Sequence, residues 1–272
     1  MSKVKELYKY LVCRRFLYRL NRLLFVLSTR GIGILNYENT ILSGEEFVLK
    51  KLSKHQYENF VCIDVGANCG LYSQKVKRII AHSTVYSIEP HPGAFYTLKL
   101  GEKSYGYYAF NIAFSDKKAT LKLFDRAEEP GNTNSHSHAS VHADVIESIH
   151  NAQLGMVHSV EATTVDAFLE VQSIEHINLL KIDVEGHEFS VLLGAMQSIK
   201  AGKIDFIQFE FNQMNTVSKV FMRDFFGLLR GYKLYRMLQD FLAPLDINET
   251  LICELFAYQN ILAVRDGVFV PK

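Results

Sequence analysis

The stretch Phe60-Val-Cys-Ile-Asp64-Val-Gly66-Ala-Asn68-Cys-Gly70 decides the fold of this chain. Four apolar residues are followed by an acid, then by two glycines, and a helical pattern runs from Leu71 to Ile80. This order predicts a buried strand, a sharp turn and a helix. Glycine lets a backbone approach a ligand closely, and a helix start offers unpaired N–H donors. We therefore expect a nucleotide-like ligand at the turn.

The same order of strand and helix repeats along the chain. Thr84-Val-Tyr-Ser-Ile-Glu89 is a second β-rich run that ends in an acid, as do Ile177–Asp183 and Ile204–Glu210. Right-handed crossovers bring the ends of such parallel strands to one edge of a doubly wound sheet, where ligands bind. Between them, a run ending at Phe114 and the alternating run Thr120–Phe124 are expected to form a hairpin.

Length and composition indicate one α/β domain with appendages. The chain has 272 residues, of which 48% are hydrophobic and 22% charged, and this balance argues against disorder. We expect a helical prefix over residues 1–55, a ligand-binding domain over 56–272 and a lid-like insertion at about 126–159. The four cysteines show neither zinc spacing nor a disulfide framework, and no apolar run reaches membrane-spanning length. These features predict a cytoplasmic protein.

Residues 1–30 are strongly basic, with eight Lys or Arg against the single acid Glu6. Apolar residues recur among them at helical spacing, so this part is expected to form an amphipathic helix. The favoured interpretation is a helix docked on the core by its apolar stripe. Peripheral attachment to an anionic membrane surface uses the same pattern and stays open, whereas no nucleic-acid partner is expected.

The acids at the first two strand ends indicate which nucleotide-like ligand fits. Glu89 can accept hydrogen bonds from both hydroxyls of a ribose, and Asp64 suits a cationic amino-acid group better than a pyrophosphate. The spacing of Gly66, Asn68 and Gly70 differs from G-x-G-x-x-G, and no G-K-[ST] follows. Dinucleotide and P-loop interpretations are therefore weakened.

Seven short motifs follow one another over roughly residues 30–265. They are Arg30-Gly-Ile-Gly-Ile-Leu-Asn36, Ser43-Gly-Glu45, Asp64-Val-Gly-Ala-Asn-Cys-Gly-Leu-Tyr-Ser73, Ile88-Glu-Pro90, Asn111-Ile-Ala-Phe-Ser-Asp116, Leu180-Lys-Ile-Asp-Val-Glu-Gly-His-Glu188 and Phe209-Glu-Phe-Asn212. In this order they resemble the FkbM-type S-adenosylmethionine-dependent methyltransferase family. The resemblance implies a Rossmann-like class I methyltransferase fold, with a seven-stranded, mostly parallel sheet whose last strand is antiparallel. It also implies S-adenosylmethionine as the donor and O-methylation, commonly of sugars or polyketide hydroxyls.

The resemblance further implies roles for individual residues. The expected cofactor-binding residues are Asp64, Gly66, Ala67, Asn68, Gly70, Tyr72, Ser73, Glu89, Pro90, Asn111 and Asp183. Among them, Glu89 would bind the ribose and Asn111 the adenine. The candidate catalytic residues, beside the sulfonium methyl, are Asp183, Glu185, His187 and Glu210. The candidate substrate contacts are His138, Ser140 and Asn212.

Methylation of a hydroxyl needs a base or a metal, because a sugar hydroxyl is a poor nucleophile at neutral pH. His187 is the candidate base, since an ordinary histidine pKa is about 6.5. Alternatively, Asp183, Glu210 and Asn212 offer oxygen ligands for magnesium, although no metal site is assigned. We expect an O-methyltransferase acting on a sugar, glycan or other secondary metabolite, as in polysaccharide biosynthesis. The alternatives are an NAD-dependent oxidoreductase and a cofactor-binding scaffold without turnover.

Overall fold

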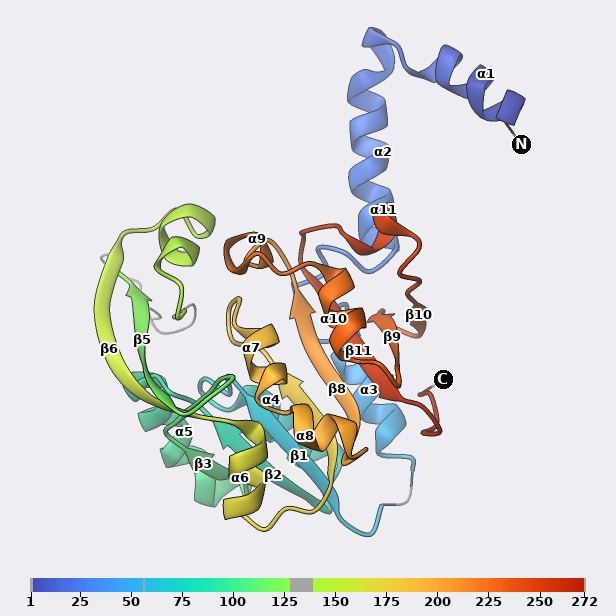
Figure 1. Cartoon of the computed structure of the whole chain (residues 1–272). Coiled ribbons are helices and arrows are strands. Elements are labelled where there is room, and N and C mark those ends of the chain that lie inside the picture. The colour runs from blue at the N-terminus through green and yellow to red at the C-terminus, as the bar shows by residue number, and fades with distance from the viewer. Residues whose placement is uncertain (1, 56, 128–138, 272) are drawn as a thin grey trace.

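An eight-stranded sheet forms the centre of the computed structural model, which describes residues 2–55, 57–127 and 139–271 (Figure 1). In spatial order, its strands are β10 (Leu242–Pro244), β9 (Tyr232–Met237), β11 (Gln259–Arg265), β8 (Ile204–Phe211), β7 (Ile177–Ile182), β1 (Phe60–Val65), β2 (Ser83–Ile88) and β3 (Tyr108–Phe110). Neighbours from β3 to β8 are parallel, whereas β11 is antiparallel to β8 and β9. The expected mostly parallel, doubly wound sheet with an antiparallel last strand is confirmed.

The large sheet has one strand more than the seven expected. The additional strand, β10, pairs antiparallel with β9 over three residues after a turn in which the Leu238 N–H donates to the Phe241 carbonyl at 3.0 Å. Pro244 lies in this edge strand, where its missing N–H costs no ladder bond. Three residues give too short an alternation for sequence periodicity to reveal the strand.

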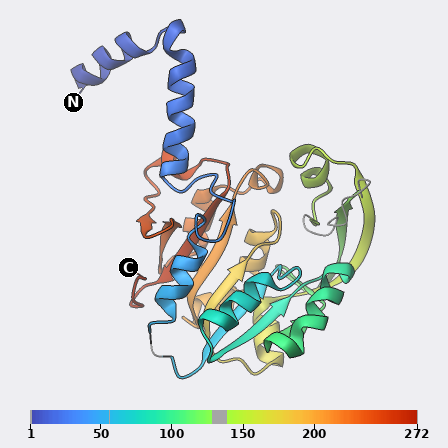
Figure 2. The same cartoon turned by 180° about the vertical axis from the view of Figure 1, so that it is seen from behind.

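Helices cover both faces of this sheet (Figures 1 and 2). One face packs against α6 (Val165–Val171), α7 (Glu188–Leu193), α8 (Met196–Lys200) and α10 (Met222–Leu228), and the other against α3 (Glu45–Leu52), α4 (Leu71–Ile79) and α5 (Pro92–Tyr105). Successive strand residues point to opposite faces, so Leu180 joins the first core and Leu179 the second. Two one-turn helices, α9 (Asn215–Ser218) and α11 (Thr250–Cys253), lie in connections near the C-terminus.

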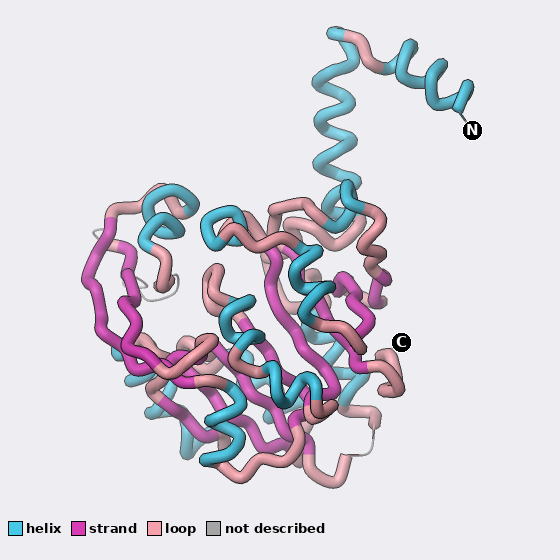
Figure 3. Tube along the Cα trace, viewed as in Figure 1, coloured by secondary structure: helices cyan, strands magenta, loops and turns pink. Residues whose placement is uncertain are grey.

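A second, three-stranded sheet stands beside the first in the order β4 (Ala113–Phe114), β6 (Leu154–Thr163) and β5 (Ala119–Arg126) (Figure 3). The expected hairpin between the two earlier runs is wrong, because β4 and β5 both pair with β6 and have Ala162 as a common partner. The insertion at about 126–159 includes more than half of β6, and a π-helix, η3 (Val145–Ile149), precedes this strand. His138 lies outside the described residues.

The N-terminal residues form two helices, α1 (Ser2–Val12) and α2 (Tyr18–Gly31), joined through a 3₁₀ turn, η1 (Arg15–Leu17). The prediction that the amphipathic helix docks on the core is wrong: α2 buries Thr29 at its end, and the arm projects away from the body (Figures 1 and 2). By contrast, α3 packs into the second core, so residues from about 34 onward belong with the body. Among the described residues, no helix has the length and apolar character needed to cross a bilayer.

Candidate active site

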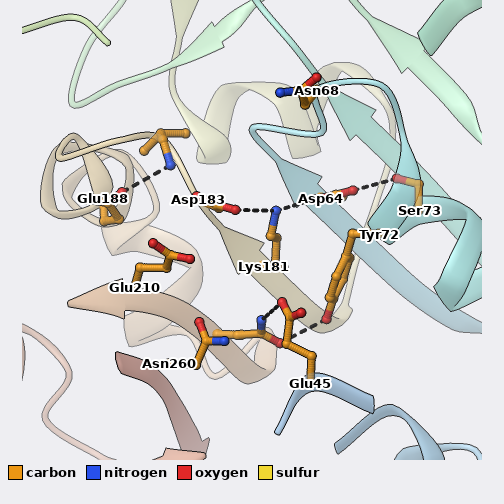
Figure 4. A network of polar contacts seen from close by, with 12 residues as sticks. Glu45, Asp64, Asn68, Tyr72, Ser73, Lys181, Asp183, Glu188, Glu210 and Asn260 are labelled. Atoms are coloured by element: carbon orange, nitrogen blue, oxygen red, sulfur yellow. Dashed lines mark hydrogen bonds and ion pairs between the residues drawn. The ribbon is translucent and has the colours of Figure 1, made fainter. Parts of the chain in front are cut away.

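A row of buried polar residues crosses four central strands near their carboxyl ends (Figure 4). Asp64 on β1 pairs in register with Ser87 on β2 and with Lys181 on β7, and Lys181 pairs with Gln208 on β8. All four side chains are at least 95% buried. The two central residues, Asp64 and Lys181, are charged, and the two outer residues, Ser87 and Gln208, are not. Because residues in register share a face, these side chains all point toward α3 and α4.

Lys181 is the cation at the centre of this row. Its Nζ lies 3.1 Å from Asp64 Oδ1 and 3.2 Å from Asp183 Oδ2, and it lies 5.1 Å from the centre of the Tyr72 ring. Burial alone lowers the pKa of a lysine, but the nearby carboxylates of Asp64, Asp183 and Glu45 outweigh it and raise the Lys181 pKa. The charged ammonium thus links the glycine-turn strand to the strand that ends at Asp183.

Two helices hold the row in place by hydrogen bonds. From α4, the Ser73 hydroxyl donates to Asp64 Oδ2 at 2.7 Å, and the Tyr72 hydroxyl donates to Gln208 Oε1 at 2.9 Å. From α3, Glu45 Oε1 accepts from Gln208 Nε2 at 2.9 Å. The expected cofactor residues Tyr72 and Ser73 therefore use their hydroxyls inside the protein, where they fix the strand ends.

The glycine turn is pressed against the end of β7. Gly66 has φ +79°, and a Cβ there would lie 1.7 Å from the Asp183 carbonyl oxygen, so only glycine fits. The amides of Gly66 and Ala67 both donate to the Ile88 carbonyl at 3.0 Å, and the Gly70 amide donates to the Ala67 carbonyl at 2.8 Å. Since these N–H groups are used internally, the turn does not offer the cluster of donors that a pyrophosphate needs.

Glu89 follows β2 and is 6% exposed. Its carboxylate accepts from the Asn68 amide at 2.7 Å and the His91 amide at 2.8 Å, and burial raises its pKa to about 7. Each carboxylate oxygen retains a lone pair for a further donor. Asn111 is exposed and donates its amide hydrogens to the carbonyls of Glu89 and Pro90, so it shapes this turn from outside.

One pocket connects the turn after β1 with the loop after β7. It is lined by Val65, Gly66, Asn68, Ile88, Glu89, Pro90, Ala113, Phe114, Leu123, Ala139, Val141, Asp183, Val184, Glu185 and His187. The expected cofactor residues Gly66, Asn68, Glu89, Pro90 and Asp183 are thus brought together with the candidate catalytic residues Glu185 and His187. The others in the expected cofactor set do not line this pocket; Ala67 and Tyr72 line a neighbouring groove together with Lys181.

The loop between β7 and α7 carries three of the four catalytic candidates, Asp183, Glu185 and His187. Glu188 closes the loop, because its Oε1 accepts from the Val184 and Gly186 amides at 3.1 Å each. His187 precedes α7, and its Nε2 lies 3.0 Å from the Ser115 hydroxyl. Burial, followed by the neighbouring His142, lowers the His187 pKa to about 4. The imidazole at the pocket is therefore neutral at physiological pH, and the same shift makes it a weaker base than an ordinary histidine.

Glu210 and Asn212 lie at the end of β8, beside the pocket lining. Burial, with further contributions from Asp183 and other nearby carboxylates, raises the Glu210 pKa well above its ordinary value. Asn212 donates to Glu210 at 3.2 Å, and its Oδ1 accepts from the Met214 amide at 2.8 Å. The Asn212 oxygen already accepts from the Met214 amide and its nitrogen donates to Glu210, so both ends of this side chain are used within the protein, and no metal site is assigned to the set.

The segment that returns from the insertion is attached to the catalytic loop. The Ser140 hydroxyl donates to the Glu185 carbonyl at 2.8 Å, and the Ser140 backbone bridges to Phe124 on β5. Ser140 is fully buried, and its hydroxyl links the insertion to the catalytic loop by this hydrogen bond. Its neighbours Ala139 and Val141 line the pocket.

A histidine and carboxylate cluster joins β5 and β6 to the Glu89 turn. Asp125 Oδ2 lies 3.0 Å from His91 Nε2 and 2.9 Å from His158 Nε2, a grouping that resembles a metal site. However, His91 Nδ1 accepts from the Gly93 and Ala94 amides at the start of α5, so the proton sits on Nε2. A protonated Nε2 donates to Asp125 and cannot bind a metal, and the cluster is a hydrogen-bond network.

Sequence reasoning did not single out Lys181 or Glu45 as part of the site. The available signal for Lys181 was a lysine inside the mostly apolar strand Ile177–Ile182, because a charged side chain in a buried strand needs a partner. Glu45 opens α3 and is recognisable only once Gln208, 163 positions away, is known to donate to it.

The sheet order, the glycine turn and the acid-ended strands define a nucleoside-binding α/β domain of the class I methyltransferase type. A sequence model of the methyltransferase FkbM domain matches residues 64–234, more than half of the chain. The chain belongs to this methyltransferase family. This assignment confirms the expected family and removes the NAD-dependent oxidoreductase from the alternatives.

Two fungal proteins are similar to the chain in sequence. It is 28% identical over 147 residues to Methyltransferase 1 of Beauveria bassiana (strain ARSEF 2860), covering 48% of this chain and 57% of that protein. It is 28% identical over 176 residues to Methyltransferase sdnD of Sordaria araneosa, covering 55% and 68%. The chain therefore matches little more than half the length of the first relative. Among solved structures, the plantazolicin methyltransferase BpumL in complex with SAH is 10% identical, with a TM-score of 0.42 and coverage of 97% and 98%.

Proposed function

We propose that this protein transfers a methyl group from S-adenosylmethionine to a hydroxyl group of a sugar, glycan or other secondary metabolite. The observation that carries the proposal is one pocket whose lining includes Glu89 together with Asp183, Glu185 and His187. A nucleoside bound at Glu89 extends its reactive end toward these three side chains. The shared pocket supports a role for these three side chains beside the acceptor.

The residues of the pocket fit this donor. Glu89 retains acceptor capacity for a ribose diol, while the amides of the glycine turn are used internally and offer little to a pyrophosphate. The acidic surroundings of Asp183 and Glu185 suit a cationic ligand. When bound, S-adenosylmethionine supplies an electrophilic methyl group on a positively charged sulfur.

The protein's own side chains accept a proton and align the acceptor with the donor. His187 lines the pocket as a neutral imidazole and takes the hydroxyl proton as the acceptor oxygen bonds to the methyl carbon and the carbon–sulfur bond breaks. Asp183 helps to orient the acceptor beside His187, while Lys181 holds the Asp183 carboxylate at 3.2 Å. Alignment of two reactants in one site supplies several kcal/mol, roughly, toward the barrier.

The apolar part of the pocket supports water exclusion around the reacting atoms. Phe114, Leu123 and Val141 line it on the side of the second sheet. Displacing water strengthens the interactions of His187 and Asp183 with the acceptor. The hydroxyl character of the acceptor rests on these two residues, and its carbohydrate or secondary-metabolite class, including a place in polysaccharide biosynthesis, rests on the motif resemblance. The proposed cytoplasmic site of action rests on the cysteine pattern and the short apolar runs of the sequence.

The test measures transfer of a labelled methyl group onto nucleotide-sugars, oligosaccharides, lipid-linked glycans and polyketide alcohols. We expect a product methylated on oxygen, with kcat reduced about 100-fold or more in His187→Gln because the base is lost. The matched control is His82→Gln, which changes an exposed histidine away from the pocket and should keep the wild-type rate. Chelation by EDTA should leave the rate unchanged, because the proposed mechanism takes the proton with His187 and uses no metal.

Three results would contradict the proposal. Methylation on nitrogen or carbon would exclude the hydroxyl acceptor, and wild-type turnover by His187→Gln would exclude the base. Cofactor binding without transfer to any acceptor class would favour the scaffold without turnover.

A further inference from the structure

The N-terminal arm, defined as α1 and α2 with the turn between them, leaves its apolar side chains exposed. Its exposed large hydrophobic residues are Val4, Leu7, Tyr8, Tyr10, Leu11, Phe16, Tyr18, Leu20, Leu23, Leu24, Phe25, Val26 and Leu27. Isolated exposed hydrophobic residues are ordinary, but a contiguous set of this size marks an interaction surface. The arm stands clear of the body in both views (Figures 1 and 2), so the body does not cover this set.

Each helix of the arm carries an apolar stripe. Spacings of three and four residues bring side chains to one face, and the stripes comprise Val4, Leu7, Tyr8 and Leu11 in α1, and Leu20, Leu23, Leu24 and Leu27 in α2. Basic residues lie off the stripes, namely Lys5 and Lys9 in α1 and Arg19 and Arg22 in α2. This is the pattern of a helix that lies in a membrane interface.

Charge separates the arm from the body. Residues 1–30 contain eight Lys or Arg and one acid, whereas the remaining 242 residues contain 22 Lys or Arg and 28 Asp or Glu. A second arm would bring further positive charge without acids to pair with it, so self-association of arms is disfavoured. A nucleic acid would match the charge but leave the apolar stripes in water. An anionic lipid surface satisfies both properties.

We propose that the N-terminal arm binds the anionic surface of a membrane, with its apolar stripes inserted at the boundary of the acyl chains and its basic residues among the headgroups. The exposed aromatic residues Tyr8, Tyr10, Phe16, Tyr18 and Phe25 suit this boundary, because their rings prefer the interface between water and lipid. Membrane attachment is independent of methyl transfer, since the pocket residues all lie beyond residue 64.

The test is co-sedimentation of the full chain with vesicles of phosphatidylcholine containing about a third phosphatidylserine. We expect binding that weakens as salt is added and is nearly absent on phosphatidylcholine alone. Arg19→Gln/Arg22→Gln should weaken binding roughly 30-fold, which corresponds to about 1 kcal/mol for each charge near the surface. Leu23→Asn/Leu27→Asn should weaken it about 10-fold or more, because two leucines no longer enter the acyl region.

Matched controls change the same residue types on the body. Lys200→Gln/Lys203→Gln removes two exposed charges, and Leu100→Asn/Leu251→Asn removes two exposed leucines. Both control variants should sediment with vesicles as the wild type does. Because all the substituted arm residues are exposed, the arm variants should bind S-adenosylhomocysteine and unfold thermally as the wild type does, which separates loss of attachment from loss of folding.

The proposal is overturned if the full chain fails to sediment with anionic vesicles at low salt, or if the arm variants bind them like the wild type. An arm-dependent dimer in sedimentation velocity without vesicle binding would assign the stripes to a second copy. Arm-dependent binding of a duplex without vesicle binding would assign the charges to nucleic acid, and both results also overturn the proposal.

Discussion

The ion pair between Lys181 and Asp64 gives the sharpest test of the site. In Lys181→Met, the aliphatic part of the side chain is kept and the ammonium is removed, so Asp64 loses its partner at 3.1 Å while remaining completely buried. Breaking a buried pair by removing one partner costs about 3–5 kcal/mol, because an uncompensated charge stays inside. The second contact, to Asp183, adds little because that side chain is 36% exposed and solvent screens it.

We therefore expect the free energy of unfolding to fall by about 3–5 kcal/mol. At about 2–4 °C per kcal/mol for a chain of this size, Tm should fall by roughly 6–20 °C. Calorimetry and urea unfolding followed by circular dichroism measure both quantities. Lys233→Met is the matched control, since Lys233 is exposed on β9, and it should change stability by about 0.5 kcal/mol or less.

A second variant separates charge from packing. In Asp64→Asn/Lys181→Met neither charge remains, and the asparagine oxygen can still accept from Ser73, so this variant should be more stable than Lys181→Met alone. If Lys181→Met unfolds within about 1 kcal/mol of the wild type, or if the double variant is the less stable of the two, the loss does not come from a buried, unpaired carboxylate.

The remaining predictions concern the pocket. Glu89→Gln should weaken binding of S-adenosylhomocysteine about 10–100-fold by calorimetry, because a charge-assisted bond to the ribose is lost; unchanged affinity removes Glu89 from the cofactor site. Asp183→Asn should lower kcat about 100-fold or more while the cofactor Kd stays within about 5-fold, and a wild-type kcat contradicts its role in orientation. The His187 pKa of about 4 lies below the ordinary 6.5, so between these values the unfolded chain binds the proton and the native protein does not. Wild-type stability should accordingly fall by up to roughly 3 kcal/mol relative to His187→Gln as pH decreases from 6.5 to 4, and parallel pH profiles of the two proteins disprove a buried neutral imidazole.

The strand ends were predictable from sequence because the signal is local. A buried apolar run followed by an acid marks Asp64, Glu89, Asp183 and Glu210, and the topology of parallel strands then brings those ends to one edge. Gly66 was predictable for the same reason, although the group that it approaches so closely, the Asp183 carbonyl, became known only with the fold.

The partners of short polar side chains were not predictable. Asn111, Ser140 and Asn212 were expected to contact cofactor or substrate, yet each has hydrogen-bond partners supplied by the protein itself. Residue type shows that such a side chain needs partners, whereas the fold decides whether a ligand or the backbone provides them. The prediction that α2 packs on the core was wrong for a related reason, because an amphipathic stripe has the same sequence pattern whether protein or lipid covers it.

The separate small sheet has a consequence for how this architecture diversifies. Within the described residues, β6 forms ladders with β5 and with β4, and neither β5 nor β6 pairs with the large sheet. Changes of side chain in the connection between β5 and β6 therefore need not alter the register of β1, β2, β7 and β8. Because Ala139 and Val141 of this connection line the pocket, such changes would reshape the pocket wall while the strand ends stay in place.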